Sequence, residues 1–282
     1  ATIRLQNGNK TREDGIPMKR RSCKYLLTAA LLCAALTLPA KAARRRVPVQ
    51  ADAIPVSAAA YVEQGVTYVP LRALLNALGS WQVWWDGEAG QAAAISGSAS
   101  LRADPAGNVI RVNGIALSGR VTVESGVTYV PLRLVCEALG CKVEWDPYLG
   151  GVAVTSPGAA YDAGELYWLS HIIYAESGAE SMAGQIAVGN VILNRVESSR
   201  FPNTVEGVIF DRKDAVQFEP VSNGQIYKTP SAQSVEAARR VLNGENVIGS
   251  ALYFYAPALS QGVWINASCT YQQTIGCHRF YL

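Results

Sequence analysis

The hydrophobic pattern from residue 53 onward predicts a strand followed by an amphipathic helix. The β-branched and aromatic run at 66–69 predicts a strand, which Pro70 ends. Four leucines then follow at the i, i+3, i+4 and i+7 spacing of a helix with one buried stripe, and Gly79 suits its end. A further strand closes on a Trp-Asp pair at 85–86. The four leucines are Leu71, Leu74, Leu75 and Leu78.

The same pattern occurs twice. The eight residues GVTYVPLR at 65–72 recur unchanged at 126–133, and each copy continues into a helical pattern and a strand that ends on Trp-Asp. An identity of this length with matching landmarks indicates a duplicated module. The repeated Arg72 and Arg133 are either structural cations near a helix start or ligand-binding cations, and the pattern leaves both readings open.

A carboxylate interrupts the apolar stripe of the next helix. Leu166, Leu169 and Ile173 lie on one face of a helix predicted over 165–177, and the next position on that face is Glu176. A carboxyl group buried away from a cation has a raised pKa, which suits a general acid at neutral pH. The alternative is a glutamate at a frayed helix end that reaches water.

The following helix, predicted over 180–197, is apolar around most of its circumference and is expected to be a buried central helix. Its polar interruptions are Gln185, Asn190 and Asn194. Buried amides must be hydrogen-bonded, so these either satisfy backbone groups or point into a site.

The last part of the chain mixes short elements. Thr204 can cap a short helix, residues 211–230 read as a polar loop, and residues 231–243 as a surface helix. Strands are predicted at 252–255 and within 271–281. The fold class is therefore α+β, with a small duplicated α+β module followed by a mainly α domain that carries a short β-hairpin.

The first forty-two residues resemble an export signal. Basic residues after Met18 precede an apolar stretch at 25–38 and a small-x-small pattern at 40–42. The apolar stretch is shorter than the roughly 20 residues that span a bilayer. We expect residues 1–42 to be an upstream extension plus a cleaved secretory signal peptide starting at Met18, which leaves a secreted protein with no stable membrane anchor.

Composition and charge narrow the class of partner. With 49% hydrophobic and 17% charged residues, the chain has enough apolar material for folded cores. After residue 42 it holds 17 basic and 20 acidic residues, so the net charge of that part is −3. This gives no support to a nucleic-acid-binding surface, which requires clustered positive charge.

Export makes disulfides possible for the four cysteines after the signal. Cys269 and Cys277 flank a short run that could form one hairpin, so they are a candidate bridge. Cys136 and Cys141 lie within and just after a predicted helix, and are either bridged or free buried thiols. No CxxC spacing supports a structural zinc site.

The repeat resembles the copper amine oxidase N-terminal-like module, whose pattern VPLR, LG and WD occurs in both copies. The resemblance implies a small accessory domain at 43–155 with a targeting or spacer role, which includes binding to a cell wall polymer. No histidine precedes His171, so the imidazole-rich site that copper requires is not expected there. A Pro-Gly-Ala segment at 156–164 reads as the linker to the next domain.

Residues 165–282 resemble the SleB-like family of spore cortex-lytic enzymes and cell wall hydrolases, through the motifs YAESGAE, GQIAVGNVILNRV, QFEPVSNGQI, ALYFYAP and TIGCHRFY. The resemblance implies a lysozyme-like, mostly helical domain that cleaves peptidoglycan glycan strands as a lytic transglycosylase. It places the single essential glutamate at Glu176. Residues expected to contact the sugars are Gln217, Phe218, Asn190 and Tyr255.

A lone catalytic acid fits a transglycosylase better than a hydrolysing glycosidase, which usually needs two carboxylates. The expected reaction splits the bond between N-acetylmuramic acid and N-acetylglucosamine and forms a 1,6-anhydro sugar, with no cofactor and no metal. The substrate would be spore cortex or vegetative wall. One alternative is an N-acetylmuramoyl-L-alanine amidase, for which His171 and His278 offer few zinc ligands. The other is a non-catalytic protein that binds the cell wall.

Overall fold

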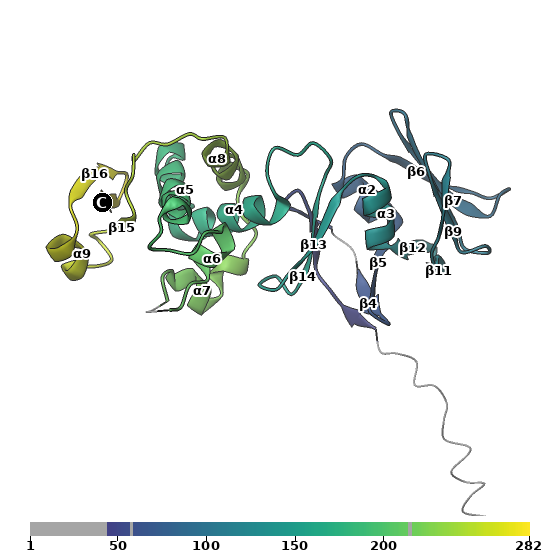
Figure 1. Ribbon diagram of the computed structural model, residues 1–282, viewed down its shortest axis with the longest axis horizontal. Coiled ribbons are helices and arrows are strands. Elements are labelled where there is room, and N and C mark those ends of the chain that lie inside the picture. Colours follow the sequence, from purple (N-terminus) through teal and green to yellow (C-terminus); the bar gives the residue numbers. More distant parts are fainter. Residues whose placement is uncertain (1–43, 57–58, 214–215) are drawn as a thin grey trace, which may run out of the picture. The chain divides into compact units, whose positions relative to one another are not determined.

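The computed structural model describes residues 44–56, 59–213 and 216–282 (Figure 1). The expected signal peptide and its start at Met18 lie outside these residues. Among the helices described, none combines the length and the apolar character needed to cross a membrane.

The two copies of the repeat pair with each other in one five-stranded sheet. Strands β5 (Val66–Pro70) and β12 (Val127–Pro131), which have the same sequence, run antiparallel with Val69 opposite Val130. The copies are therefore related by an approximate two-fold axis at this point. In sheet order the strands are β1 (Arg45–Arg46), β4 (Tyr61–Glu63), β5 (Val66–Pro70), β12 (Val127–Pro131) and β11 (Thr122–Glu124).

The hairpins that feed this pairing have equivalent tight turns. Both central residues of each turn have positive φ, at Gln64 and Gly65 in the first copy and at Ser125 and Gly126 in the second. Two positive φ values are the signature of a type I′ turn, whose twist matches that of paired strands. The strand predicted at 66–69 is confirmed, with this turn setting its register.

Each copy then forms its predicted helix, α2 (Leu71–Ala77) and α3 (Leu132–Ala138). Leu71, Leu74 and Leu75 are buried, which confirms the stripe. Two more sheets flank these helices. One has the order β10 (Ile115–Ser118), β9 (Val109–Val112), β8 (Ala99–Asp104), β7 (Gln91–Ser96) and β6 (Gln82–Asp86); the other has β13 (Lys142–Asp146), β14 (Gly151–Thr155), β2 (Val49–Ala51) and β3 (Ile54–Pro55).

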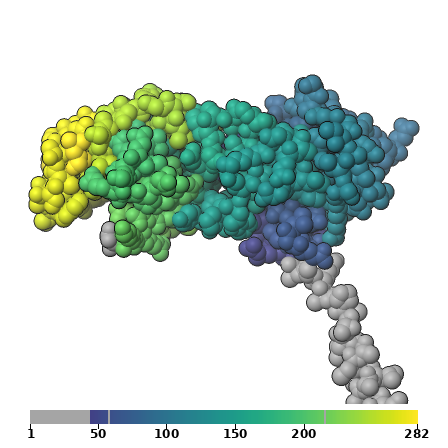
Figure 2. Space-filling view, in the orientation of Figure 1, coloured from purple at the N-terminus to yellow at the C-terminus, as the bar shows by residue number. Residues whose placement is uncertain are grey.

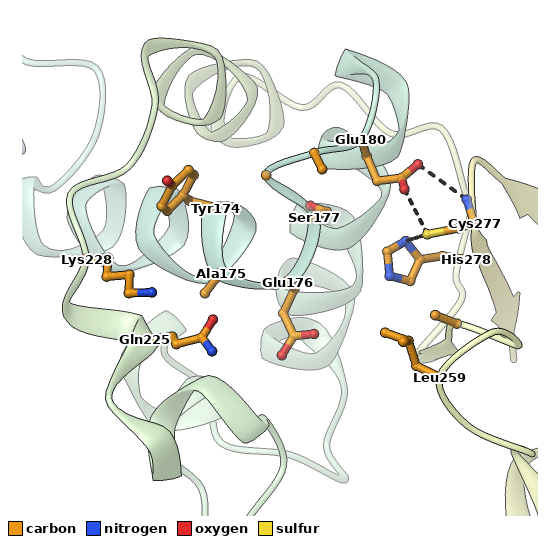
Figure 3. Close-up of a pocket in the computed structure, with 13 residues that line it drawn as sticks. Tyr174, Ala175, Glu176, Ser177, Glu180, Gln225, Lys228, Leu259, Cys277 and His278 are labelled. Atoms are coloured by element: carbon orange, nitrogen blue, oxygen red, sulfur yellow. Dashed lines mark hydrogen bonds between the residues drawn. The ribbon is translucent and has the colours of Figure 1, made fainter.

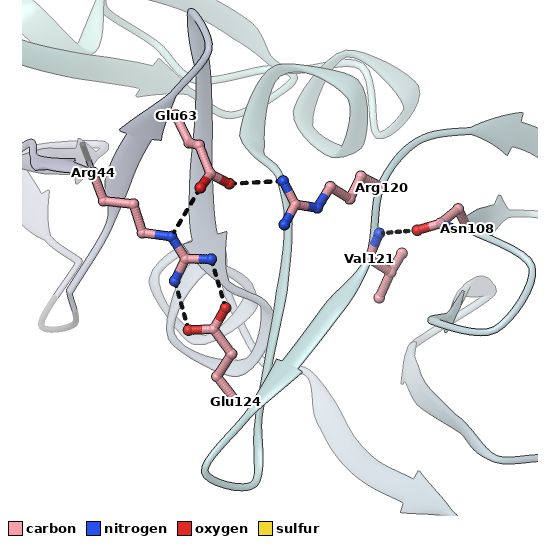
Figure 4. A network of polar contacts seen from close by, with 6 residues as sticks. All are labelled: Arg44, Glu63, Asn108, Arg120, Val121 and Glu124. Carbon is pink, nitrogen blue, oxygen red and sulfur yellow. Dashed lines mark hydrogen bonds and ion pairs between the residues drawn. The ribbon is translucent and has the colours of Figure 1, made fainter. Parts of the chain in front are cut away.

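An ion-pair network ties the two hairpins together (Figure 4). The buried Glu63 carboxylate accepts from Arg44 Nε at 3.3 Å and from Arg120 Nη1 at 2.7 Å. Arg44 also donates both terminal nitrogens to the Glu124 carboxylate, at 2.6 and 2.7 Å. A buried carboxylate that faces two guanidinium groups keeps its charge compensated, so this network holds the N-terminal strands against the second repeat.

The C-terminal part is mainly helical, as predicted. Four of its helices begin at side-chain caps: Asp162, Ser181, Thr204 and Ser231 each accept a backbone N–H of the first turn. The helices are α4 (Ala163–Ser177), α5 (Met182–Glu197), α6 (Val205–Ile209), α7 (Glu219–Asn223), α8 (Ala232–Leu242) and α9 (Val263–Ser268).

One part of the predicted polar loop at 211–230 is wrong. It contains α7 and the 3₁₀ turn η1 (Gln225–Tyr227). Phe218, Val221 and Ile226 are buried in the helical core, so three apolar side chains draw this polar segment onto the domain. Pro220 in the first turn of α7 costs no hydrogen bond.

Helices α4, α5 and α8 pack against one another, with the buried Ile173 of α4 beside Gly189 of α5 and Val241 of α8. The predicted hairpin is a three-stranded sheet in the order β15 (Tyr253–Tyr255), β17 (His278–Tyr281) and β16 (Tyr271–Ile275). Phe280 of β17 packs with Ala187 and Val191 of α5, and Figure 2 shows the yellow C-terminal segment directly against the green helices. The predicted α+β class, with a β-rich N-terminal region and a helical C-terminal domain, is confirmed.

A buried hydrogen bond links the last repeat to the first helix of the C-terminal part. Trp168 Nε1 of α4 donates to Asp146 Oδ2 at 2.7 Å, and the other Asp146 oxygen accepts the N–H groups of Tyr148 and Leu149. The Trp-Asp landmark of the second repeat therefore joins the repeat to α4, whereas Asp86, its counterpart in the first repeat, pairs with Arg102 at 3.1 Å.

Candidate active site

Glu176 lies on the last turn of α4 and points into a pocket of about 500 Å³. The pocket is formed by the end of α4 and the turn after it, by η1, by the segment after β15 and by the turn between β16 and β17. Figure 3 shows the Glu176 carboxylate between Gln225 on one side and Leu259 on the other. The predicted stripe therefore turns this carboxyl inward.

The pocket keeps the Glu176 carboxyl protonated at unusually high pH. Burial raises its pKa to about 7, the neighbouring Glu219 charge adds to the rise, and Arg195 opposes it. Among the described residues, no hydrogen bond or ion pair engages this carboxylate. A carboxyl group that titrates near neutral pH and is not engaged by protein partners can both release and accept a proton.

Arg195 is a buried cation whose charge acts on Glu176, and the sequence pattern did not reveal it. The residue is 5% exposed and its guanidinium lies over the rings of Phe201, Phe218 and Tyr253, at 4.8, 5.3 and 5.5 Å from their centroids. Its Nε donates to the Leu252 carbonyl at 2.8 Å. Burial lowers its pKa to about 10, so it remains a cation at neutral pH. Aromatic faces and neutral acceptors hold this charge, which leaves Glu176 unpaired.

The expected sugar contacts do not gather around Glu176. Gln217 is half-buried, and its Oε1 accepts from Arg195 Nη1 at 3.4 Å. Phe218 is 3% exposed and belongs to the helical core, which corrects its assignment as a sugar contact, because a buried ring cannot meet a substrate. Tyr255 is half-buried, and its hydroxyl donates to Asn266 Oδ1 at 3.3 Å. None of the three lines the pocket.

Asn190 is a structural residue, which corrects its expected role in substrate binding. The side chain is 3% exposed in the middle of α5. Its Nδ2 donates to the Glu245 carbonyl at 2.7 Å, and its Oδ1 accepts the Val247 N–H at 2.9 Å. Both ends of the amide are therefore used to hold the loop after α8, and Asn190 does not line the pocket.

Replacing Asn190 with alanine is expected to lower the free energy of unfolding by about 1–3 kcal/mol, because it leaves a half-buried backbone donor and a half-buried acceptor unpaired. Asn190→Asp keeps the acceptor for Val247 but turns a carboxylate oxygen toward the Glu245 carbonyl, so it should be destabilising as well. Denaturant unfolding measures both. If Asn190→Ala instead leaves stability unchanged and weakens only substrate binding, the structural role is wrong.

Residues that do line the pocket include several that the sequence pattern did not select. Gln225 and Lys228 come from η1 and the residue after it, and His278 and Leu259 form the opposite side. Gln225 belongs to the quoted motif QFEPVSNGQI, which was the available signal for it. His278 lines the pocket only because the β16–β17 hairpin folds back over α5, and no local sequence pattern predicts that packing.

The predicted Cys269–Cys277 disulfide is wrong in this structure, where both cysteines are free. They lie at opposite ends of β16, and the chain turn falls at Gly276 and Cys277 rather than between the two cysteines. An extended strand of five residues separates its ends by about 13 Å, beyond the roughly 7 Å between the Cα atoms of a bridged pair. Cys136 and Cys141 are also free, and both are buried.

The repeats carry two equivalent grooves. One groove, of about 350 Å³, is lined by the first residues of α2, by β6 and by the β11–β12 hairpin. The other, of about 280 Å³, is lined by the first residues of α3, by β13 and by the β4–β5 hairpin. Trp85 and Trp145 hold matching places in them and are 49% and 48% exposed. Arg72 and Arg133 also match, and Arg133 donates to Glu137 at 3.1 Å, which supports the structural reading of that arginine.

Comparison with known proteins agrees with this architecture. Residues 49–157 match the Copper amine oxidase N-terminal domain, and residues 179–281 match the Cell Wall Hydrolase family. The catalytic domain of the germination-specific lytic transglycosylase SleB from Bacillus anthracis is 38% identical, over 45% of this chain and 99% of that chain, with a TM-score of 0.40. Residues 179–281 therefore carry a cell wall hydrolase domain, and the relatives similar to this part are SleB-like spore cortex-lytic enzymes.

Full-length relatives of this family are similar over the same part. The spore cortex-lytic enzyme of Bacillus cereus is 41% identical over 105 residues, which are 37% of this chain and 39% of that protein. The enzyme of the same name from Bacillus subtilis is 37% identical over 114 residues, or 40% and 36% of the two chains. The match thus spans about two fifths of the length of these SleB-like relatives, and the matched family region begins just after Glu176.

Proposed function

We propose that this SleB-like protein is a peptidoglycan lytic transglycosylase in which Glu176 serves as acid and then as base. The observation that carries the proposal is the Glu176 carboxyl itself: it has a pKa of about 7, lies in a pocket, and is not held by protein partners. The relatives named spore cortex-lytic enzyme and the B. anthracis lytic transglycosylase support the reaction class.

The proposed reaction leaves Glu176 protonated again at its end, with one net proton moved from the muramic C6 hydroxyl to the leaving oxygen. Protonated Glu176 donates to the glycosidic oxygen between N-acetylmuramic acid and N-acetylglucosamine, and the bond from the muramic C1 to that oxygen breaks. The resulting Glu176 carboxylate then takes the proton of the muramic C6 hydroxyl, whose oxygen bonds to C1. The products are a free N-acetylglucosamine 4-hydroxyl and a 1,6-anhydro sugar. No water is consumed, so one carboxyl group suffices.

The other carboxylates near Glu176 are less suited to a second catalytic role. Glu180 Oε1 accepts from Cys277 Sγ at 2.8 Å, so it is engaged in the native fold. Glu219 is exposed in the first turn of α7 and does not line the pocket. We place the protein outside the cell, in the wall, with either spore cortex or vegetative peptidoglycan as its substrate, in keeping with the expected signal peptide.

Mass spectrometry of muropeptides released from purified sacculi tests the proposed reaction. Soluble fragments that end in 1,6-anhydro-N-acetylmuramic acid are expected. Reducing muramic ends would show hydrolysis by a muramidase, and freed stem peptides would show an amidase. Digestion of cortex from spores beside vegetative sacculi separates the two substrates.

We further propose that the twin grooves of the repeats bind glycan strands of the wall. Exposed tryptophan faces stack on the C–H faces of sugars, and the two-fold arrangement presents Trp85 and Trp145 in equivalent surroundings. Two equivalent sites on one chain also suit a polymer, because binding at one site raises the effective concentration at the other.

Replacing both Trp85 and Trp145 with alanine is expected to weaken binding to sacculi by about tenfold, since each stacked ring contributes about 0.5–1.5 kcal/mol. Sedimentation with sacculi measures the bound fraction, in a Glu176→Gln background that prevents digestion. Trp264→Ala is the matched control, since Trp264 is 57% exposed in α9 and lines neither groove. Equal binding by the double variant and the control would contradict the assignment.

A further inference from the structure

We propose that Glu180, Cys277 and His278 form a binding site for Zn²⁺ on the wall of the pocket that holds Glu176. Their donor atoms all lie within 4.8 Å of one another. Cys277 Sγ is 2.8 Å from Glu180 Oε1 and 3.9 Å from His278 Nδ1. Zinc bonds of about 2.0–2.3 Å in tetrahedral geometry separate the ligand atoms by about 3.3–3.8 Å, so small side-chain movements suffice to surround the ion.

The three donors are held in place by the fold. The Glu180 backbone lies in the tight turn between α4 and α5: its N–H donates to the Ser177 carbonyl at 2.9 Å, and its carbonyl accepts from Gln185 and Gln233, both at 3.1 Å. Cys277 and His278 come from the β16–β17 turn, and the buried His278 ring packs edge-on against Phe254. Rigid supports of this kind lower the cost of assembling a metal site.

Gly276 allows the two elements to meet. Its φ is +59°, and a Cβ atom at this position would collide with Glu180 Oε2. The glycine therefore lets the turn come close enough for the Cys277 N–H to donate to Glu180 Oε2 at 3.3 Å and for the thiol to reach the other oxygen (Figure 3). The same closeness brings thiol, imidazole and carboxylate to one point.

The chemistry of the donors selects the ion. Thiolate and imidazole favour zinc over magnesium and calcium, which prefer oxygen ligands. A thiolate and a carboxylate together balance the charge of the dication. Three protein ligands leave a fourth position open, and because all three residues line the pocket, that position faces the space beside Glu176.

Occupancy by Zn²⁺ has a functional consequence that, unlike the binding itself, rests on the proposed function. The ion and its fourth ligand would take up part of the pocket in which the glycan strand must approach Glu176. We therefore expect Zn²⁺ to inhibit cleavage. The sequence gives no signal for this site, because Cys277 and His278 are adjacent and their third partner lies 97 residues earlier, a spacing that no zinc motif has.

Cobalt titration of the full chain, after treatment with chelator and reductant, tests the site. The expected result is one Co²⁺ bound per chain with a thiolate-to-metal charge-transfer band, which Zn²⁺ displaces. Cys277→Ser should lose the band and weaken Zn²⁺ binding at least about 100-fold. Cys269→Ser is the control, because Cys269 is the second cysteine of the C-terminal part and is also not buried. This variant should bind Co²⁺ and Zn²⁺ as the parent does.

An absent band in the parent, or a band that survives in folded Cys277→Ser, overturns the site. His278→Ala supplies a second variant, for which circular dichroism verifies the fold. Muropeptide release, measured for each variant with and without Zn²⁺, tests inhibition: the parent should slow and recover with chelator, and Cys277→Ser should show no zinc response. Cobalt binding in a protein that releases no muropeptides would refute the proposed function and leave the metal site standing.

Discussion

Glu176→Gln is expected to slow muropeptide release from sacculi by about 10²- to 10⁴-fold, the usual contribution of a general acid or base. The amide keeps the shape of the side chain and cannot donate a proton to the leaving oxygen. Because the same carboxyl group serves both half-reactions, no second protein group replaces it. Quantified release of soluble muramic acid measures the effect.

Glu165→Gln is the matched control. Glu165 lies on the same helix, and burial raises the pKa of its carboxyl too, but it lies at the opposite end of α4 and does not line the pocket. This variant should release muropeptides at close to the parent rate. If Glu176→Gln keeps more than about a tenth of the parent rate, a loss far below that of a general acid, the assignment of the acid is wrong.

Thermal unfolding of Glu176→Gln tests whether its loss of activity comes from the chemistry or from a damaged fold. The Glu176 pKa of about 7 is above the ordinary value of 4.5, so at pH 8 the folded state holds an ionised carboxylate in a site that disfavours it. Glu176→Gln removes this cost and should stabilise the fold at pH 8 by about 1–2 kcal/mol, allowing for water in the open pocket. Below pH 4.5 the carboxyl is neutral in both states, and the gain should vanish.

The sequence predicted the helices and strands that have a clear hydrophobic periodicity of their own. The leucine stripe at 71–78 became a buried face, because 3.6-residue periodicity decides which side of a helix meets the core. The predicted helix α4 also formed, but it is buried around most of its circumference rather than on one face. Strands β7 to β10, at 91–118, were not predicted. Their buried positions include small residues such as Ala93 and Ala103, so the alternation of apolar and polar residues is weak.

The site was predictable only in part, because local sequence patterns do not show which residues tertiary packing brings together. Glu176 departs from the pattern of its own helix, which a single sequence reveals. Arg195 and His278 reach the pocket region only through tertiary packing, and Asn190 was misassigned because a buried amide that serves a loop has the same local pattern as one that serves a substrate. The cysteines were misjudged because the position of the hairpin turn decides their separation.

The pH dependence of cleavage is expected to have an alkaline limb near pH 7. Glu176 must be protonated to donate, and its pKa is about 7, so kcat/KM should fall about tenfold for each pH unit above that value. A glycosidase with two carboxylates requires one of them ionised, and its profile is bell-shaped. Transglycosylation by a single carboxyl regenerates its own base, so here the rate should stay level down to about pH 5.

Glu219→Gln separates this limb from a general effect of pH on the fold. The Glu219 charge raises the pKa of Glu176, so its removal should move the alkaline limb to lower pH and lower the rate at pH 7. Glu165→Gln, which leaves the surroundings of Glu176 unchanged, should keep the limb in place. An unmoved limb in Glu219→Gln would mean that another group titrates there, and an acidic limb above pH 5 would point to a second catalytic carboxylate and hence to hydrolysis.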